Sequence, residues 1–425
     1  MKKIYLEYKD SENDLIKDIP IHWKTTKLKH VAKIIMGQSP SSDDYNDKEI
    51  GFPFLQGNAE FTEQYPIPKI YCDKPNKLSR KGDILLSVRA PVGALNMSNV
   101  SYAIGRGLCA IRAEKITTEF LWFCLLSAKK ELNTRLKGST FEAVTTEDVK
   151  NITIVCPVND EEQNKISSYL TRKVFEVNNL ITEKEKIITL LEEKRQSMIT
   201  EAVTKGLNPN VEMKDSGVEW IGEIPEHWEC LSFRRLTFLQ QGLQIAQEER
   251  FYENGENRLE YITVKSINNP DLIKEYIENA SDRVICTEED VLLARTGATG
   301  LVVTNIKGVF HNNFFKVNYD AQKITKDFLV FYLKQKSIQD HFKLVAGTTT
   351  IPDLNHGEFL STKCLVPPLI EQKSIIDYLE VKEREHLGIV EDIRLQIEKL
   401  KEYRQSLIYE AVTGKIDVRD FEVKA

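Results

Sequence analysis

The sequence predicts an α+β fold: two pseudo-symmetric α+β domains joined by two long helices that pair as an antiparallel coiled coil. An internal duplication predicts the two domains. Motifs within residues 9–23 return within residues 214–228 at an offset of 205, and motifs within residues 162–204 return within residues 371–413 at an offset of 209. The helices are predicted from residues 161–204, which contain neither proline nor glycine and carry apolar residues at helical spacing.

The composition is that of an ordinary globular protein. The chain has 425 residues, of which 41% are hydrophobic and 29% charged, and its net charge is −6. Its first residues turn acidic before any apolar run, and no window approaches the ~20 apolar residues of a membrane span, so we expect neither a signal peptide nor membrane association. The seven cysteines are scattered without a Cys-x-x-Cys pair. This pattern argues against a metal site and against disulfides, and it favours the cytoplasm.

Each copy divides into a globular part and a helical part. In the globular parts, the runs that begin at Asp83 and Asp290 are buried-strand patterns closed by Gly93 and Gly300, and amphipathic helices are expected near residues 120–132 and 328–342. The predicted boundaries are residues 1–158 for the first α+β domain, 159–206 for the central helix, 207–219 for a linker, 220–368 for the second α+β domain, 369–415 for the distal helix and 416–425 for a tail.

The long helices carry apolar residues at spacings of three, four and seven, which is a heptad seam. A single helix cannot bury such a stripe, and two related units in one chain favour a two-fold arrangement, so we expect the helices to pair antiparallel. Packing of each helix on its own domain is the alternative. Arg195 and Arg404 fall in the seam, and we expect them to reach a neighbouring glutamate such as Glu192 or Glu201 rather than to set the register. The predicted seam consists of Ile166, Leu170, Val177, Ile181, Ile188, Leu191, Met198, Ile375, Leu379, Val390, Ile393, Ile397, Leu400 and Leu407.

Three motifs occur in the same order in both copies. The first is Ile-Pro-x-His-Trp, at residues 19–23 and 224–228, and the second is the strand and loop at residues 81–93 and 289–300. The third is Glu-Gln-x-x-Ile, at residues 162–166 and 371–375, followed by a long helix that ends in Arg-Gln-Ser-x-Ile-x-Glu-Ala-Val-Thr. This ordered set spans nearly the whole chain, and it resembles the specificity subunit of type I restriction–modification systems.

The resemblance implies that the chain is not itself an enzyme. Each α+β domain would be a target recognition domain that reads one half of a bipartite site in double-stranded DNA, and the paired helices would set the spacer and dock two methyltransferase subunits. Restriction subunits would join to form the nuclease, and S-adenosylmethionine would be bound by the methyltransferase and not by this chain. The net charge of −6 is not that of a chain that holds DNA by charge alone, so we expect a partner to supply phosphate contacts.

The residues agree with a non-catalytic role. The chain contains neither an Asn-Pro-Pro-Tyr motif for amino methylation nor a phosphate-binding loop of the G-x-x-x-x-G-K-[ST] type. Three alternatives stay open: a recognition subunit of another restriction–modification class, a DNA methyltransferase or nuclease in its own right, and a coiled-coil adaptor that does not read DNA.

Polar loops at matched positions are the predicted DNA contacts, because Arg and Lys read guanine, Asn and Gln read adenine, and hydroxyl and basic groups also bind phosphates. These loops differ between the copies although the helices and the Ile-Pro-x-His-Trp motif agree, which is expected if each copy reads a different sequence. The alternative for each residue is a solvated loop position. No catalytic residue or metal ligand is predicted. The predicted DNA-binding residues are Gln38, Ser39, Asn58, Arg89, Arg106, Ser139, Thr140, Gln244, Lys265, Arg295, Thr296, Asn312, Asn313, Thr348 and Thr349.

Overall fold

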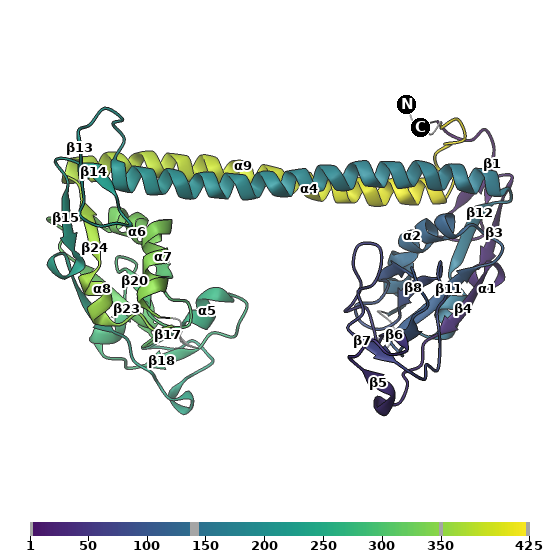
Figure 1. Cartoon of the computed structure of the whole chain (residues 1–425), viewed down its shortest axis with the longest axis horizontal. Helices are drawn as coiled ribbons and strands as arrows, with labels where there is room; N and C mark the ends of the chain where they lie inside the picture. Colours follow the sequence, from purple (N-terminus) through teal and green to yellow (C-terminus); the bar gives the residue numbers. More distant parts are fainter. Residues whose placement is uncertain (1–2, 137–143, 348–351, 422–425) are drawn as a thin grey trace. The chain divides into compact units, whose positions relative to one another are not determined.

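The chain folds into two compact units. The structure is a computed structural model that describes residues 3–136, 144–347 and 352–421. Unit 1 comprises Met1–Lys184 and Arg394–Ala425, and unit 2 comprises Glu185–Ile393. Each unit therefore contains one α+β domain together with part of both long helices (Figure 1).

The first α+β domain is built on two four-stranded sheets. One has the order β4-β11-β8-β9, and the other has the order β10-β6-β7-β5. Two shorter ladders pair β1 with β2 and β3 with β12. The strands are β1 (Tyr8–Asp10), β2 (Asp18–Pro20), β3 (Trp23–Lys27), β4 (Ala32–Met36), β5 (Tyr45–Asn46), β6 (Phe52–Leu55), β7 (Ile70–Cys72), β8 (Ile84–Ser87), β9 (Leu95–Met97), β10 (Ala103–Ile104), β11 (Leu108–Ala113) and β12 (Thr153–Pro157), and the helices are α1 (Leu28–Val31), α2 (Thr118–Leu136) and α3 (Thr146–Lys150).

The second α+β domain repeats this plan. Its sheets have the orders β16-β23-β20-β21 and β18-β17-β22-β19, and β13 pairs with β14 and β15 with β24. The strands are β13 (Met213–Asp215), β14 (Glu223–Pro225), β15 (Glu229–Ser232), β16 (Thr237–Gln241), β17 (Arg258–Ile262), β18 (Tyr276–Glu278), β19 (Ile285–Cys286), β20 (Leu292–Ala294), β21 (Val302–Val303), β22 (Gly308–Phe310), β23 (Phe314–Tyr319) and β24 (Lys363–Val366), and the helices are α5 (Val264–Asn268), α6 (Lys326–Lys334), α7 (Lys336–Val345) and α8 (His356–Ser361).

Apolar residues on the central strands explain why these sheets form. The residues of β8 and β20 are all buried, as the apolar runs after Asp83 and Asp290 predict. One helix was expected near residues 328–342, but the structure contains two, because Gln335 takes an extended conformation and its side chain accepts a hydrogen bond from the Ser337 backbone N–H. A local capping bond of this kind is invisible to apolar periodicity.

The long helices α4 (Asp160–Lys205) and α9 (Leu369–Val412) run antiparallel in both units. In unit 1, Lys184 Nζ donates to Gln396 Oε1 at 2.6 Å and Arg404 donates to Asn178. In unit 2, Arg195 binds Glu383 at 2.7 Å. Every residue of the predicted seam is buried or half-buried. The predicted fold class is confirmed: two α+β domains with a pair of antiparallel long helices.

The ends of the long helices also belong to the domain cores. Ile166 and Leu170 of α4 share the core of unit 1 with the last turns of α9, and Ile199 of α4 shares the core of unit 2 with Ile375. The sequence left helix pairing and packing on a domain as alternatives, and the structure contains both. Arg195 bonds Glu192 in its own helix, as expected. In addition, Arg195 and Arg404 each bond a residue of the opposite helix, and these contacts were not predicted.

Two leucines of α4 provide a matched test of this packing. Leu170 is fully buried, whereas Leu180 is 47% exposed. We expect Leu170→Ala to lower the stability of unit 1 by about 2–5 kcal/mol, because it removes buried contacts and leaves a cavity. Leu180→Ala should change the stability by less than about 0.5 kcal/mol. Thermal and denaturant unfolding check both variants, and equal effects would contradict the packing described here.

Candidate nucleic-acid interface

Four loops of the first domain converge at one end of its two sheets. They follow β4, β6 and β8 and connect β10 to β11, and backbone hydrogen bonds tie them together. Gln38 N donates to Ile104 O at 2.9 Å, Gly105 N donates to Leu55 O at 2.8 Å, and Val88 N donates to Gly107 O at 2.9 Å. The loops therefore form one connected surface.

The second domain repeats these bonds with different residues. Leu243 N donates to Phe310 O at 3.2 Å, His311 N donates to Ile262 O at 2.9 Å, and Arg295 N donates to Asn313 O at 2.7 Å. The bonds make Arg295 the counterpart of Val88. By the same pairing of loop positions, Asn312 is the counterpart of Arg106. The two copies thus share a backbone framework and differ in the side chains that it presents.

Two glycines make this framework possible. A Cβ at Gly37 would lie 2.1 Å from the carbonyl oxygen of Gly105, and a Cβ at Gly242 would lie 2.3 Å from the carbonyl oxygens of Phe310 and His311. Any side chain at these positions would push the converging loops apart. The first loop can therefore approach its neighbours only because it begins with glycine in both domains.

Ser39 is the centre of the polar cluster in the first domain. Its hydroxyl oxygen lies 3.0 Å from the amide nitrogen of Gln56 and accepts a hydrogen bond from the Arg106 backbone N–H at 3.3 Å. Its carbonyl oxygen accepts a hydrogen bond from the Asn76 side chain at 3.0 Å. The structure thus brings Gln38, Ser39 and Arg106 together. Asn58 and Arg89 lie on the adjoining loops.

The side chains of this surface differ in exposure. Gln38, Arg89 and Arg106 are exposed, and Ser39 and Asn58 are half-buried. In the second domain, Gln244 and Lys265 are exposed, and Thr296, Asn312 and Asn313 are half-buried. The predicted residues Ser139, Thr140, Thr348 and Thr349 lie outside the described residues.

Arg295 has a structural partner. Its Nε donates to Asp353 Oδ1 at 2.8 Å, its second nitrogen bonds the other carboxylate oxygen, and the guanidinium lies over the Phe315 ring at 5.5 Å. The Leu354 backbone N–H also donates to the Arg295 carbonyl at 3.0 Å. Arg295 therefore joins the loop after β20 to residues 353–354, and these contacts occupy much of its guanidinium.

Sequence reasoning missed Asn76 and His311. Asn76 reaches Ser39 across 37 residues of sequence, and no periodicity marks such a contact. Burial lowers the pKa of His311 from its usual value, so the ring is neutral at pH 7. Its Nδ1 accepts a hydrogen bond from the Asn313 backbone N–H at 3.0 Å, which places the ring proton on Nε2. In the sequence, the only sign of a role for His311 was its position next to Asn312 and Asn313.

Neither a metal site nor a membrane span is found in the part of the chain that the structure describes. Within residues 3–136, 144–347 and 352–421, no three His, Cys, Asp or Glu side chains are grouped so that they could hold a metal ion. Among the helices of these residues, none is both long enough and apolar enough to cross a membrane.

Comparison with known proteins identifies the family. Residues 20–192 and 225–399 match the family model described as the type I restriction modification DNA specificity domain. The chain belongs to this family. The two matched segments correspond to the two copies of the internal duplication. The predicted resemblance to the specificity subunit of type I restriction–modification systems is confirmed.

Curated relatives carry the same description. The chain is 23% identical to the type I restriction enzyme MjaVIII specificity subunit of Methanocaldococcus jannaschii, over 95% of each chain. It is 24% identical to the MjaIX specificity subunit of the same organism, over 99% of each chain. It is 37% identical to the putative MjaX specificity subunit over 205 residues, which span 48% of that relative.

Solved structures share the fold. A chain from a structural study of complex assembly and conformational transition of the type I R-M system matches with a TM-score of 0.70 and 17% identity, over 93% of this chain and 98% of that chain. The HsdS subunit from Thermoanaerobacter tengcongensis matches with a TM-score of 0.51 and 18% identity, over 94% and 98%. At these identities the comparison shows a common fold.

The pairing of Arg295 with Asp353 leads to a stability prediction. Arg295→Ala should destabilise unit 2 by about 1 kcal/mol, because it removes a two-point hydrogen-bonded ion pair that is partly exposed to solvent. Arg283→Ala, which removes an exposed arginine of the same domain, should change the stability by less than about 0.5 kcal/mol. Thermal unfolding of the two variants measures the difference. Indistinguishable melting curves would show that the pair does not stabilise the loop.

Proposed function

We propose that the chain is the non-catalytic, DNA-reading subunit of a type I restriction–modification complex. Each α+β domain acts as a target recognition domain and reads one half of a bipartite site in double-stranded DNA. The observation that carries this proposal is the loop framework that both domains share. Its backbone hydrogen bonds are the same in the two domains, whereas its side chains differ, as expected of two surfaces that read different sequences.

The exposed and half-buried polar side chains of the loops have the chemistry of base recognition. In the first domain, Arg89 and Arg106 can donate to guanine, and Gln38 and Asn58 can form paired hydrogen bonds with adenine. In the second domain, Gln244, Asn312 and Asn313 suit adenine and Lys265 suits guanine. Thr296 and the hydroxyl residues Ser139, Thr140, Thr348 and Thr349 are proposed to bind bases or phosphates. Arg295 is proposed to contribute mainly by holding its loop in place.

We also propose that the paired helices set the spacer and dock two methyltransferase subunits, which bind S-adenosylmethionine, and that restriction subunits complete the nuclease. Apolar side chains on the outer helix faces support docking, because such surfaces are commonly covered by a partner. Phe175, Leu180 and Leu190 of α4 and Leu387 and Ile389 of α9 are 47–64% exposed. Leu180 and Ile389 occupy the same position of the repeat, 209 residues apart, which suits two copies of one partner.

Methylation mapping tests the proposal. The chain is co-expressed with its methyltransferase, and methylated adenines are mapped across the genome. We expect methylation at a gapped site with two different half-sites, and methylation of an ungapped site would overturn the proposal. Arg106→Ala should relax recognition in one half-site only, by roughly 10- to 100-fold for the base it contacts, and Gln244→Ala should relax the other. Relaxation of the same half-site by both variants would contradict the division of labour.

Lengthening both helices tests the spacer function. Seven residues are inserted after Lys184 in α4 and seven after Ile393 in α9, which keeps the heptad phase of the seam. Seven residues add about 10 Å to each helix. We expect the permitted spacer to lengthen by roughly three base pairs at 3.4 Å per base pair, with both half-sites unchanged. Methylation mapping gives the spacer directly. An unchanged spacer in a complex that still methylates would contradict this role.

A further inference from the structure

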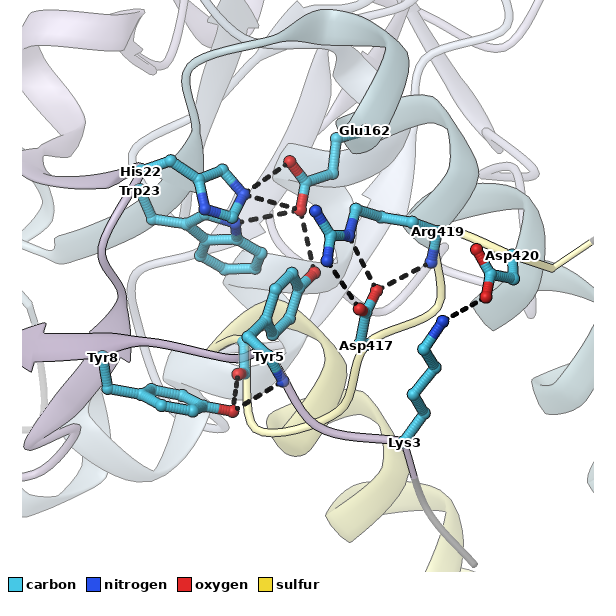
Figure 2. Close-up of polar contacts among 10 residues, drawn as sticks. Lys3, Tyr5, Tyr8, His22, Trp23, Glu162, Asp417, Arg419 and Asp420 are labelled. Carbon is cyan, nitrogen blue, oxygen red and sulfur yellow. Dashed lines mark hydrogen bonds and ion pairs between the residues drawn. The ribbon is translucent and has the colours of Figure 1, made fainter.

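A buried glutamate in the first turn of α4 gathers three donors in unit 1. Glu162 accepts hydrogen bonds from the Tyr5 hydroxyl at 2.8 Å and from Trp23 Nε1 at 3.1 Å, and its carboxylate lies 3.0 Å from His22 Nε2 (Figure 2). Its side chain is only 9% exposed. The carboxylate thus holds the His-Trp pair of the Ile-Pro-x-His-Trp motif against the start of the long helix.

The next residue, Gln163, forms a second attachment. Its side-chain oxygen accepts a hydrogen bond from the Thr117 backbone N–H at 2.9 Å, and its side-chain nitrogen donates to the Pro157 carbonyl at 3.1 Å. Thr117 directly precedes α2, and Pro157 ends β12. Gln163 is 1% exposed, so its bond to Pro157 is buried, and its bond to Thr117 is partly buried. We call Glu162 with Gln163 the first Glu-Gln bracket.

Unit 2 contains the same bracket, formed by Glu371 and Gln372. Glu371 accepts hydrogen bonds from Trp228 Nε1 at 3.0 Å and lies 2.8 Å from His227 Nε2. Gln372 accepts a hydrogen bond from the Thr325 backbone N–H at 2.9 Å and donates to the Pro367 carbonyl at 2.9 Å. Thr325 is the N-cap of α6, the counterpart of α2. The histidine, tryptophan and glutamine contacts of the first bracket therefore recur in the second.

Two attachments constrain a domain more than one does. In each unit the glutamate binds the tryptophan that begins β3 or directly precedes β15. The glutamine binds the threonine that directly precedes α2 or α6. The helix start already packs in the domain core through Ile166 and Leu170 in unit 1 and through Ile375 and Leu379 in unit 2. The two attachments add directional hydrogen bonds at two separate places to this packing.

The two indole donors are buried, since Trp23 is 1% and Trp228 0% exposed. Loss of either carboxylate would leave an indole N–H unpaired and away from water, which is unfavourable.

We propose that the two Glu-Gln brackets are positioning elements that fix the pose of each reading domain on its long helix and thereby make the complex selective for one spacer length. This inference rests on the proposed function. A domain that tilts on its helix moves its reading loops without changing their side chains. Loss of a bracket should therefore widen the range of permitted spacers and leave the half-site sequences unchanged.

The chain ends reinforce the first bracket. The Asp417 backbone N–H donates to the Lys3 carbonyl at 2.8 Å, Arg419 binds Asp417 at 2.7 Å, and the Arg419 guanidinium lies over the Tyr5 ring at 4.9 Å. Figure 2 shows Arg419 and Asp417 beside Tyr5 and Glu162. The second bracket is more exposed to solvent. Glu371 is 28% exposed, and residues 207–210, which follow the end of α4, are also exposed.

Spacer selectivity tests the proposal. Complexes that carry Glu162→Ala or Glu371→Ala are assayed for methylation of DNA libraries in which the half-sites are fixed and the spacer varies by one base pair at a time. We expect the preference for the optimal spacer over its neighbours to fall at least fivefold. Glu162→Gln should retain most of the preference, since its Oε1 still accepts from Tyr5 and Trp23. Glu161→Ala is the control, because Glu161 is exposed and pairs with Lys165 of its own helix.

The outcomes are distinguishable. If the bracket only stabilises the fold, its loss should lower methylation equally at all spacers, and that result would overturn the proposal. An unchanged spacer preference in folded Glu162→Ala and Glu371→Ala complexes would overturn it as well. If an alanine variant does not fold, Tyr5→Phe is used instead, because it removes the hydroxyl donor to Glu162 and keeps the ring. It should weaken the spacer preference by a smaller factor. An unchanged spacer preference in this variant would also overturn the proposal. A wild-type complex that methylates no gapped site would overturn the proposed function first, and this inference with it.

Discussion

The apolar seam between α4 and α9 is the interaction on which the rest of the structure depends. Single helices of 46 and 44 residues cannot bury an apolar stripe alone. Because the helices run antiparallel, each unit contains the beginning of one helix and the end of the other. Leu170 and Leu407 accordingly lie in one domain core, and Ile199 and Leu379 in the other. Each domain is thus completed by a segment that is distant in the sequence, and neither copy of the duplication forms its core from its own residues alone.

The residues that match between the two copies and the residues that differ lie in different parts of the molecule. Residues shared by both copies make part of the seam, the Ile-Pro-x-His-Trp contacts and the hydrogen bonds of Glu162 and Glu371. Residues that differ lie on the loops, where Arg106 in one domain corresponds to Asn312 in the other. A change of loop side chain costs little stability when the position is exposed. The half-sites read by such a subunit could therefore change while the helices and their partner surface remain the same.

Much of the fold was predictable, because heptad spacing and an internal repeat are local signals that survive in one sequence. The seam, the antiparallel pairing and the buried strands after Asp83 and Asp290 belong to this class. The converging loops were predictable as polar regions that differ between the copies, and their contact with DNA stays a prediction. Individual contacts were not predictable: Arg295 meets Asp353 across 58 residues, and Tyr5 meets Glu162 across 157. The repeated Glu-Gln pair was visible in the sequence, but its contacts were not, because their partners come from separate parts of each domain.

If the two domains are equivalent DNA-reading modules, as we propose, one should be able to replace the other, and a domain replacement tests this most directly. Residues 15–158 are replaced by residues 220–368, and the adenines methylated by the complex of this chain with its methyltransferase are mapped across the genome. The account predicts a symmetric site in which the second half-site appears twice, as an inverted repeat, with a spacer close to the original. A folded, active complex that still reads the original first half-site, or that methylates a site without inverted symmetry, would contradict it.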